Sequence, residues 1–460
     1  MAIYPRRVLQ RLLDENCRLL GRGQTKEHVQ KLNRMHLDLT LATEWEVVLL
    51  NAFSKAGNVT HEKDFSGSRY ADIYFESFGD QNKNFVADIT AISDKGLDEH
   101  NPFYYLWEDL VKNVKERGLR PDSFRLEVDE VTTNLYKGGP KAQLKLPGRA
   151  RFAQVIFNEK FENFLREVSH DPNSIHTLDV KTTEIGVTIT YNPNQMYGTG
   201  GHLDYTQVFS LEDNSIYKAL ESKVLQLEGT NFSGHLGIIL CDGGCSFFNR
   251  KSVTGLSFSM DDVIKKFLYE HPSISFVITF GIEKQRPFVP MSNEDNPYQI
   301  IIGYYRGHKF DSLGLNLHDV LEKVGNELPE PESNARNALN LLKGRNPTEG
   351  RSHWGGLTMS PGKQTTEVKI SARALLEFLA GKVDQKTFFE RHGFIPSELT
   401  AGPPVNPFEG GLSRGQLIDE IQIEKSDTED DDWITIRLKG PDPAVSPFVV
   451  PASEAKPSKK

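Results

Sequence analysis

Two stretches of the chain, RYADIYFES (69–77) and NFVADITAISD (84–94), decide the fold prediction because each places an aspartate in an apolar, strand-like run. These aspartates are Asp72 and Asp88. Aspartate is depleted in strands, and a carboxylate in apolar surroundings costs several kcal/mol of desolvation unless it is paired or bound to a metal. One such residue can be a structural partner of Arg69 or a strand-end cap. Two of them in successive strands favour a functional site.

A helix is predicted immediately before these strands, over residues 41–55. Thr43 is a suitable N-cap, and one apolar stripe follows at helical spacing, formed by Trp45, Val48, Leu49 and Ala52. Gly57 ends the helix. Three strands are then predicted at 59–63, 70–75 and 85–92. The order of elements is therefore helix, strand, strand, strand.

The helix carries two acids, Glu44 and Glu46, which point about 200° apart at ~100° per residue. Only one of them can face the strands. Glu46 flanks the apolar stripe, whereas Glu44 lies with Asn51 and Lys55 on the polar side. We therefore expect Glu46 to face the strands. The alternative is that both acids are solvated.

Further helices and strands follow in alternation, which predicts an α/β or α+β core. The expected helices are 103–117, 157–168, 215–227 and 261–270, and the expected strands are 124–131, 185–191, 236–241 and 274–280. The Gly-, Pro- and Lys-containing stretch 137–151 is expected to be a loop.

The length of 460 residues allows two or three domains. We expect a helical N-terminal cap (1–40), an α/β core (41–306), a linker with one short helix (307–370) and a small C-terminal module (371–460). Within that module, 371–394 resembles a helical hairpin and 417–438 contains two strand-like runs around an acidic turn. A disordered tail is expected from about residue 443.

The net charge of −9 is the wrong sign for a protein that binds nucleic acid through its whole surface. A local basic groove can still coexist with an acidic remainder. No apolar run approaches the ~18 residues of a membrane span, and three cysteines do not suggest a disulfide framework. We expect a cytoplasmic protein that does not enter a membrane.

Acids at the ends of adjacent strands, with another on a neighbouring helix, suit phosphodiester cleavage. That reaction needs a divalent cation to stabilise developing negative charge and to activate water. Hard carboxylate oxygens are the protein ligands that Mg²⁺ prefers. Glu46, Asp72 and Asp88 offer this arrangement.

In these elements the chain resembles the PD-(D/E)XK, or restriction-endonuclease-like, superfamily. The resemblance rests on a helix with an acid, a strand with Asp72, a strand with Asp88-Ile89-Thr90, and then a helix and a strand, over roughly 41–280. It implies a restriction-endonuclease-like mixed sheet flanked by helices. It also implies a metal-dependent nuclease in which Glu46, Asp72 and Asp88 bind Mg²⁺ or Mn²⁺.

The chain departs from the superfamily pattern at Thr90, which replaces the lysine expected two residues after the second acid. A threonine cannot supply positive charge near the attacked phosphate. The expected substitute is Lys223, on the helix that precedes the strand 236–241, where it shares a face with Gln226. Lys95 is the second choice.

An alternative makes 103–117 the second core helix. Lys112 or Lys115 would then approach the acids, and Lys223 would belong to an insertion.

The sequence-based hypothesis is a metal-dependent endonuclease that cleaves DNA, in restriction, repair or anti-phage defence. The rival is a catalytically inactive protein of the same fold that serves as a binding or scaffold protein. Thr90 favours the rival, and retention of all three acids favours the enzyme. Protein partners, or a homo-oligomer formed through the C-terminal module, are also expected.

Overall fold

A computed structural model of the chain shows two compact units. One unit comprises residues 16–345, and the other comprises residues 3–15 together with 346–460. Their limits do not coincide with the domain boundaries expected from the sequence. The structure describes residues 3–33, 37–78, 83–94, 96–135, 139–195, 198–202, 208, 210–248, 257–284, 298–307, 316–342, 355–359, 366–381, 384–385, 388–389, 406–413, 415–426 and 432–440.

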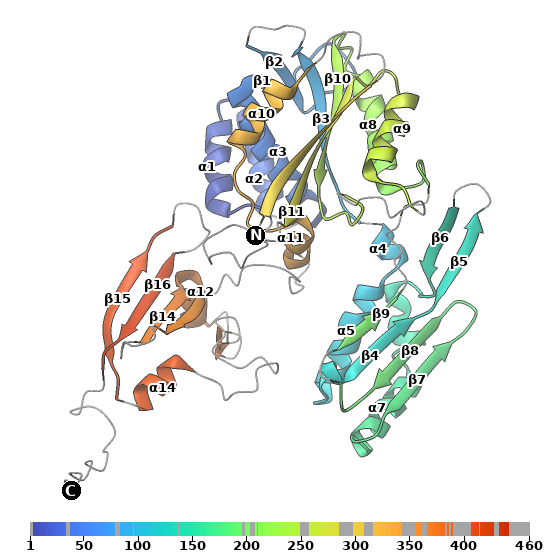
Figure 1. Cartoon of the computed structure of the whole chain (residues 1–460), viewed down its shortest axis with the longest axis vertical. Coiled ribbons are helices and arrows are strands. Elements are labelled where there is room, and N and C mark those ends of the chain that lie inside the picture. The colour runs from blue at the N-terminus through green and yellow to red at the C-terminus, as the bar shows by residue number, and fades with distance from the viewer. Residues whose placement is uncertain are drawn as a thin grey trace, which may run out of the picture. The chain divides into compact units, whose positions relative to one another are not determined.

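The larger unit is built on a six-stranded mixed sheet, so the α/β prediction with a mixed sheet is confirmed (Figure 1). The strand order is β1-β2-β3-β10-β11-β12. Strands β3, β10 and β11 run parallel, and the remaining neighbours are antiparallel. The bounds are β1 Gly57–His61, β2 Ile73–Ser77, β3 Phe85–Ile92, β10 His235–Asp242, β11 Phe276–Lys284 and β12 Tyr298–Arg306.

One face of this sheet is covered by α3 (Leu37–Ala56), which also contacts α2 (Arg22–Asn33), α10 (His318–Glu327) and α11 (Ala335–Leu342). The expectation that Glu44 and Asn51 lie on a solvated side of this helix is wrong. Both are only 2% exposed. Because α3 packs against other helices as well as the sheet, its second side is buried too.

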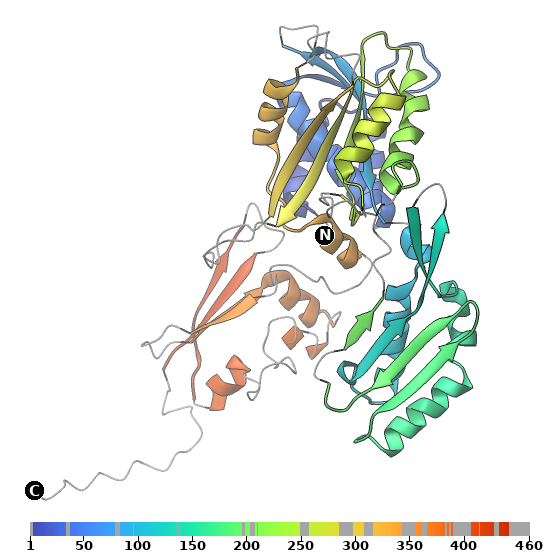
Figure 2. The ribbon, with the colours of Figure 1, turned by 45° about the vertical axis from the view of Figure 1, so that its right-hand side comes forward.

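The opposite face is covered by α8 (Ser215–Glu228) and α9 (Met260–Glu270), as Figures 1 and 2 both show. Asn214 caps α8 by accepting a hydrogen bond from the Tyr217 amide. Val86 and Ile92 of β3 belong to the apolar core beneath these helices. Since side chains alternate along a strand, Asp88 and Thr90 face the same side.

The start of β2 differs from the sequence-based expectation. The strand begins at Ile73, so Asp72 precedes it instead of lying inside it. The chain before Asp72 is attached to the C-terminal end of α8, where the Ser68 and Arg69 amides donate to the carbonyl of Gly229.

A module with its own apolar core is inserted between β3 and α8. Its four-stranded sheet has the order β7-β8-β4-β9. The bounds are α4 Leu97–His100, α5 Phe103–Glu116, β4 Phe124–Val128, β5 Glu130–Leu135, β6 Gly139–Leu144, α6 Phe152–Val155, α7 Glu159–His170, β7 His176–Lys181, β8 Gly186–Tyr191 and β9 Thr199–Gly201.

The loop expected at 137–151 is wrong in part, because β6 pairs with β5 as an antiparallel hairpin. A two-stranded ladder is held by main-chain hydrogen bonds, and it does not require the apolar alternation that identifies a half-buried strand. The Gly-, Pro- and Lys-containing composition therefore did not reveal it.

The smaller unit contains a four-stranded antiparallel sheet of order β13-β14-β16-β15. It also contains residues 3–15, which include all of α1 (Arg6–Asn16) except its last residue. Its other elements are β13 Gly355–Met359, β14 Thr366–Ser371, α12 Ala372–Leu379, α14 Pro407–Ser413, β15 Ile418–Glu424 and β16 Trp433–Leu438. Arg7 Nη1 lies 2.8 Å from Asp432 Oδ1 and connects the N-terminal segment to this unit.

The stretch 307–370, expected to be a linker with one short helix, contains α10, α11, β13 and nearly all of β14. Its Pro, Gly and polar composition suggested a linker. The strands within it are short, so they leave little apolar alternation to recognise. The two strands expected within 417–438 are confirmed, as is the first helix of the expected hairpin. Most of 382–394 and the tail beyond 440 lie outside the described residues. No helix among the described residues is long and apolar enough to cross a membrane.

Candidate functional site

The register of three strands brings Asp72 next to Asp88. Ile73 pairs with His61 of β1 on one side and with Ala87 of β3 on the other. Continuing the antiparallel register by one residue places Asp72 opposite Asp88, and opposite residues point to the same face. Asp72 is held there because its Oδ2 accepts a hydrogen bond of 2.7 Å from the Ile89 amide.

Asp88 is fully buried and forms an ion pair with Lys223. The Lys223 ammonium on α8 lies 3.1 Å from Asp88 Oδ2, while the Lys223 side chain keeps 21% of its surface exposed. Within the described parts of the chain, neither oxygen of Asp88 accepts a well-aligned hydrogen bond. A buried carboxylate with spare acceptor capacity beside a partly exposed cation is able to bind a further positively charged group.

A short network positions Lys223. Its ammonium donates to Gln226 Oε1 at 3.3 Å, and Gln226 Nε2 donates to the carbonyl of Tyr70 at 3.1 Å. Gly67 passes so close to the same helix end that an added Cβ would meet the Gly229 oxygen at 2.3 Å. The segment that carries Asp72 and the helix that carries Lys223 are therefore fixed to each other.

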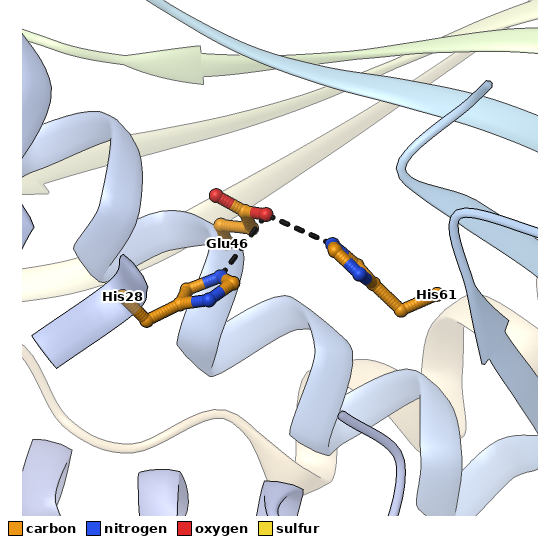
Figure 3. Close-up of side chains that lie close together, drawn as sticks. All are labelled: His28, Glu46 and His61. Carbon is orange, nitrogen blue, oxygen red and sulfur yellow. Dashed lines mark hydrogen bonds and ion pairs between the residues drawn. The ribbon is translucent and has the colours of Figure 1, made fainter. Parts of the chain in front are cut away.

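Glu46 directs its carboxylate towards two histidines. Its Oε1 lies 3.1 Å from His28 Nε2 and 3.1 Å from His61 Nε2, as Figure 3 shows. Burial alone would raise the pKa of Glu46, but the hydrogen bonds and charges of the two imidazoles outweigh it and lower that pKa. Burial likewise opposes charge on His28, but the hydrogen bond and charge of Glu46 raise the pKa of His28 above its usual value.

The two aspartates carry more negative charge than their surroundings balance. Burial, the adjacent charge of Asp88 and the charge of Glu46 together raise the pKa of Asp72 well above its ordinary value, against the Ile89 amide, which lowers it. A cation between these groups would relieve this repulsion.

The other residues considered from the sequence lie elsewhere or are not described. Glu44 is buried on α3, and Thr90 lies half-buried two residues beyond Asp88. Lys112 and Lys115 are on α5, whose apolar side belongs to the separate core of the inserted module. Since α8 and not α5 packs on β3, α8 is the helix that faces Asp88. Lys95 lies outside the described residues.

Three residues near the acids were missed by sequence reasoning: His28, Lys31 and His61. Burial opposes charge on Lys31, but the hydrogen bond that it donates to Glu27 and the charges of Glu46, Glu27 and Asp72 raise its pKa. The sequence contained one usable signal, because His28 and Lys31 are spaced i, i+3 on one helix face. His61 could have been noted as the last residue of a strand that is followed by the Asp72 strand.

Comparisons with protein-family models, with curated proteins and with solved structures give no match to this chain.

Proposed function

We propose that the protein is a metal-dependent nuclease of the PD-(D/E)XK type that cleaves phosphodiester bonds of DNA. The observation that carries the proposal is the contact of 3.1 Å between Lys223 and the fully buried Asp88. It supplies a cation close to the second acid, where Thr90 has none. The order α3, β1, β2, β3, α8, β10 agrees with the order that the family resemblance implies.

Asp72 and Asp88 would hold the metal through carboxylate oxygens, whereas Glu46, expected from the sequence as a third ligand, directs Oε1 to His28 and His61. The fit rests on the spare acceptor capacity of Asp88 and on the raised pKa of Asp72. When bound, Mg²⁺ or Mn²⁺ would stabilise charge on the scissile phosphate and lower the pKa of the attacking water.

Lys223 has the remaining role in this mechanism. Its ammonium would donate hydrogen bonds to the attacking water or to a phosphate oxygen, and so stabilise the negative charge that develops during attack. Its partial exposure leaves it accessible to a substrate on the solvent side. The bonds through Gln226 to Tyr70 would hold it in place, which limits the reorganisation needed during the reaction.

The test is cleavage of supercoiled, linear and single-stranded DNA, and of RNA, in Mg²⁺ or Mn²⁺. The wild type should cleave DNA, and Asp72→Asn and Asp88→Asn should not. Asp179→Asn, on exposed strand β7, is the matched control and should retain full activity. Cleavage of DNA at the same rate by the wild type and all three variants would rule out this site.

A folded wild type that cleaves no substrate would favour the rival, an inactive binding or scaffold protein. Restriction, repair or anti-phage defence would be the setting of an active enzyme.

A further inference from the structure

A group of three side chains from three different elements lies beside the proposed nuclease acids. His28 comes from α2, Glu46 from α3 and His61 from the last position of β1. Each offers one possible ligand atom, and these three atoms lie within 4.8 Å of one another. Figure 3 shows the three side chains. Both imidazole side chains are 3% exposed, so the group is closed off from bulk solvent on the histidine side.

His28 has one nitrogen whose role is fixed. Its Nδ1 lies 2.8 Å from the carbonyl oxygen of Gln24, and a carbonyl only accepts, so Nδ1 carries the proton. In the neutral ring, Nε2 is then an unprotonated lone pair that faces Glu46. Nε2 is buried and lies 3.1 Å from Glu46 Oε1, although this contact lacks the alignment of a strong hydrogen bond. Metal-binding histidines typically have this arrangement, with the far nitrogen oriented by a main-chain carbonyl.

The distances from Glu46 to the two histidines suit ligands of one ion. Bonds of ~2.0–2.2 Å to nitrogen and oxygen place neighbouring ligand atoms about 3.0–3.5 Å apart for angles between octahedral and tetrahedral. Glu46 Oε1 lies 3.1 Å from each histidine Nε2. A set of two imidazoles and one carboxylate is characteristic of Zn²⁺, Mn²⁺ or Fe²⁺, whereas Mg²⁺ prefers oxygen ligands.

We propose that His28, Glu46 and His61 form a binding site for a divalent transition metal, separate from the oxygen site at Asp72 and Asp88. Three protein ligands leave coordination positions open for water or another group. The proposal does not depend on the proposed function, because it concerns binding and is tested by binding.

The alternative is a purely structural group in which protonated histidines pair with Glu46. The two possibilities differ in their response to metals. A structural group has no specific affinity for Zn²⁺ or Mn²⁺, whereas a metal site binds one equivalent and loses affinity with either imidazole.

The experiment uses the full chain, freed of metals with a chelator and titrated calorimetrically with Zn²⁺, Mn²⁺ and Mg²⁺. We expect one equivalent of Zn²⁺ or Mn²⁺ to bind to the wild type. His28→Ala and His61→Ala should each weaken this binding by more than ~100-fold, since losing a ligand exceeds the effect of losing its orienting partner. His170→Ala, at the exposed end of α7, is the matched control and should bind as the wild type does.

His28→Gln and His61→Gln provide less disruptive variants if an alanine variant does not fold, and circular dichroism checks the fold. Asp88→Asn should keep the transition-metal equivalent even if it loses cleavage, which separates failure of this inference from failure of the proposed function. A wild type that binds neither Zn²⁺ nor Mn²⁺, or histidine variants that bind as tightly as the wild type, would overturn the proposal.

Discussion

Two adjacent groups of charged residues in the larger unit are balanced in opposite ways. Asp72 and Asp88 are two acids beside one lysine, and the pKa of Asp72 is raised. Glu46 is one acid between two imidazoles, and its pKa is lowered. The first group lacks positive charge and offers only oxygen ligands, whereas the second is nearly satisfied and offers nitrogen. The same helix-and-sheet framework therefore holds two groups of side chains with different donor atoms.

The largest expected effect concerns the lysine of the first group. Lys223→Ala should reduce DNA cleavage by about 10²- to 10³-fold, the usual loss when one group that stabilises developing negative charge is removed. Metal affinity should stay nearly unchanged, because Lys223 acts on water and phosphate. Initial cleavage rates and a metal titration measure the two effects. Lys218→Ala, which changes an exposed lysine on the same helix, is the control. Cleavage at the wild-type rate by Lys223→Ala would show that Lys223 has no part in the mechanism.

The contribution of Glu46 and its histidine partners to the free energy of unfolding should depend on pH. Glu46→Gln should lower the free energy of unfolding of the metal-free protein by about 2 kcal/mol, because it removes hydrogen bonds to a charged acceptor. The lowered pKa of Glu46 gives stability that is present above about pH 4.5 and lost at lower pH. The raised pKa of His28 gives stability that is present below about pH 6.5 and lost as pH rises through the folded pKa.

The difference between wild type and Glu46→Gln should thus be greatest between about pH 4.5 and 6.5. Urea unfolding at pH 4, 5.5 and 8 provides the measurement. Thr188→Val, which removes a hydrogen bond to exposed Asp179 in the inserted module, is a control whose effect should not follow this pH window. A difference that is constant over the three pH values would show that the titrations of Glu46 and His28 are not linked to folding.

A smaller effect on cleavage is expected at Gln226, which connects Lys223 of α8 to the carbonyl of Tyr70. Gln226→Ala should reduce cleavage about 10-fold, because it frees the Lys223 ammonium without removing it. The pH profile of kcat should change with it, and Gln226→Glu should restore the lysine contact. Rates over a pH series measure this. An unchanged rate and profile would mean that Lys223 is positioned by other contacts.

The smallest expected effect is a gain in stability. Asp72→Asn should raise the free energy of unfolding of the metal-free protein by about 1 kcal/mol at pH 7, because it removes a half-buried, repelled charge while keeping an acceptor for the Ile89 amide. Since the folded pKa is raised, this wild-type aspartate costs stability as pH rises above about 4. Melting curves at pH 4 and 7 should therefore differ between the two proteins only at the higher pH, and a destabilised Asp72→Asn would indicate a structural aspartate.

The sequence predicted those elements whose apolar pattern matches the side that the fold buries. The strand 85–92 is confirmed as β3 with its stated bounds. An apolar run of eight residues is typical of a buried strand. The helix 215–227 was expected before the strand 236–241, and the structure has Lys223 on that helix beside Asp88. Order along the chain predicts such neighbours when connections follow the usual packing of helices on sheets.

The histidine group was not predictable in the same way, since it depends on α2 crossing the helix that carries Glu46. Nothing in local periodicity specifies that contact. The burial of Glu44 was missed for the same reason, because a helical wheel shows polarity and not the number of partners that a helix has. The attachment of the chain before Asp72 depends on bonds to Gly229, a residue far away in sequence.

The pairing of β3 with β10 also has a consequence for synthesis of the chain. Phe85 pairs with His235, 150 positions later (235 minus 85), with the inserted module between them. Closing so long a connection is slow, and domains generally fold from the N-terminal side as the chain emerges. Asp88 therefore leaves the ribosome well before the lysine that neutralises it. During that interval the inserted module, with its own core, can fold while the pair of Asp88 and Lys223 is still incomplete.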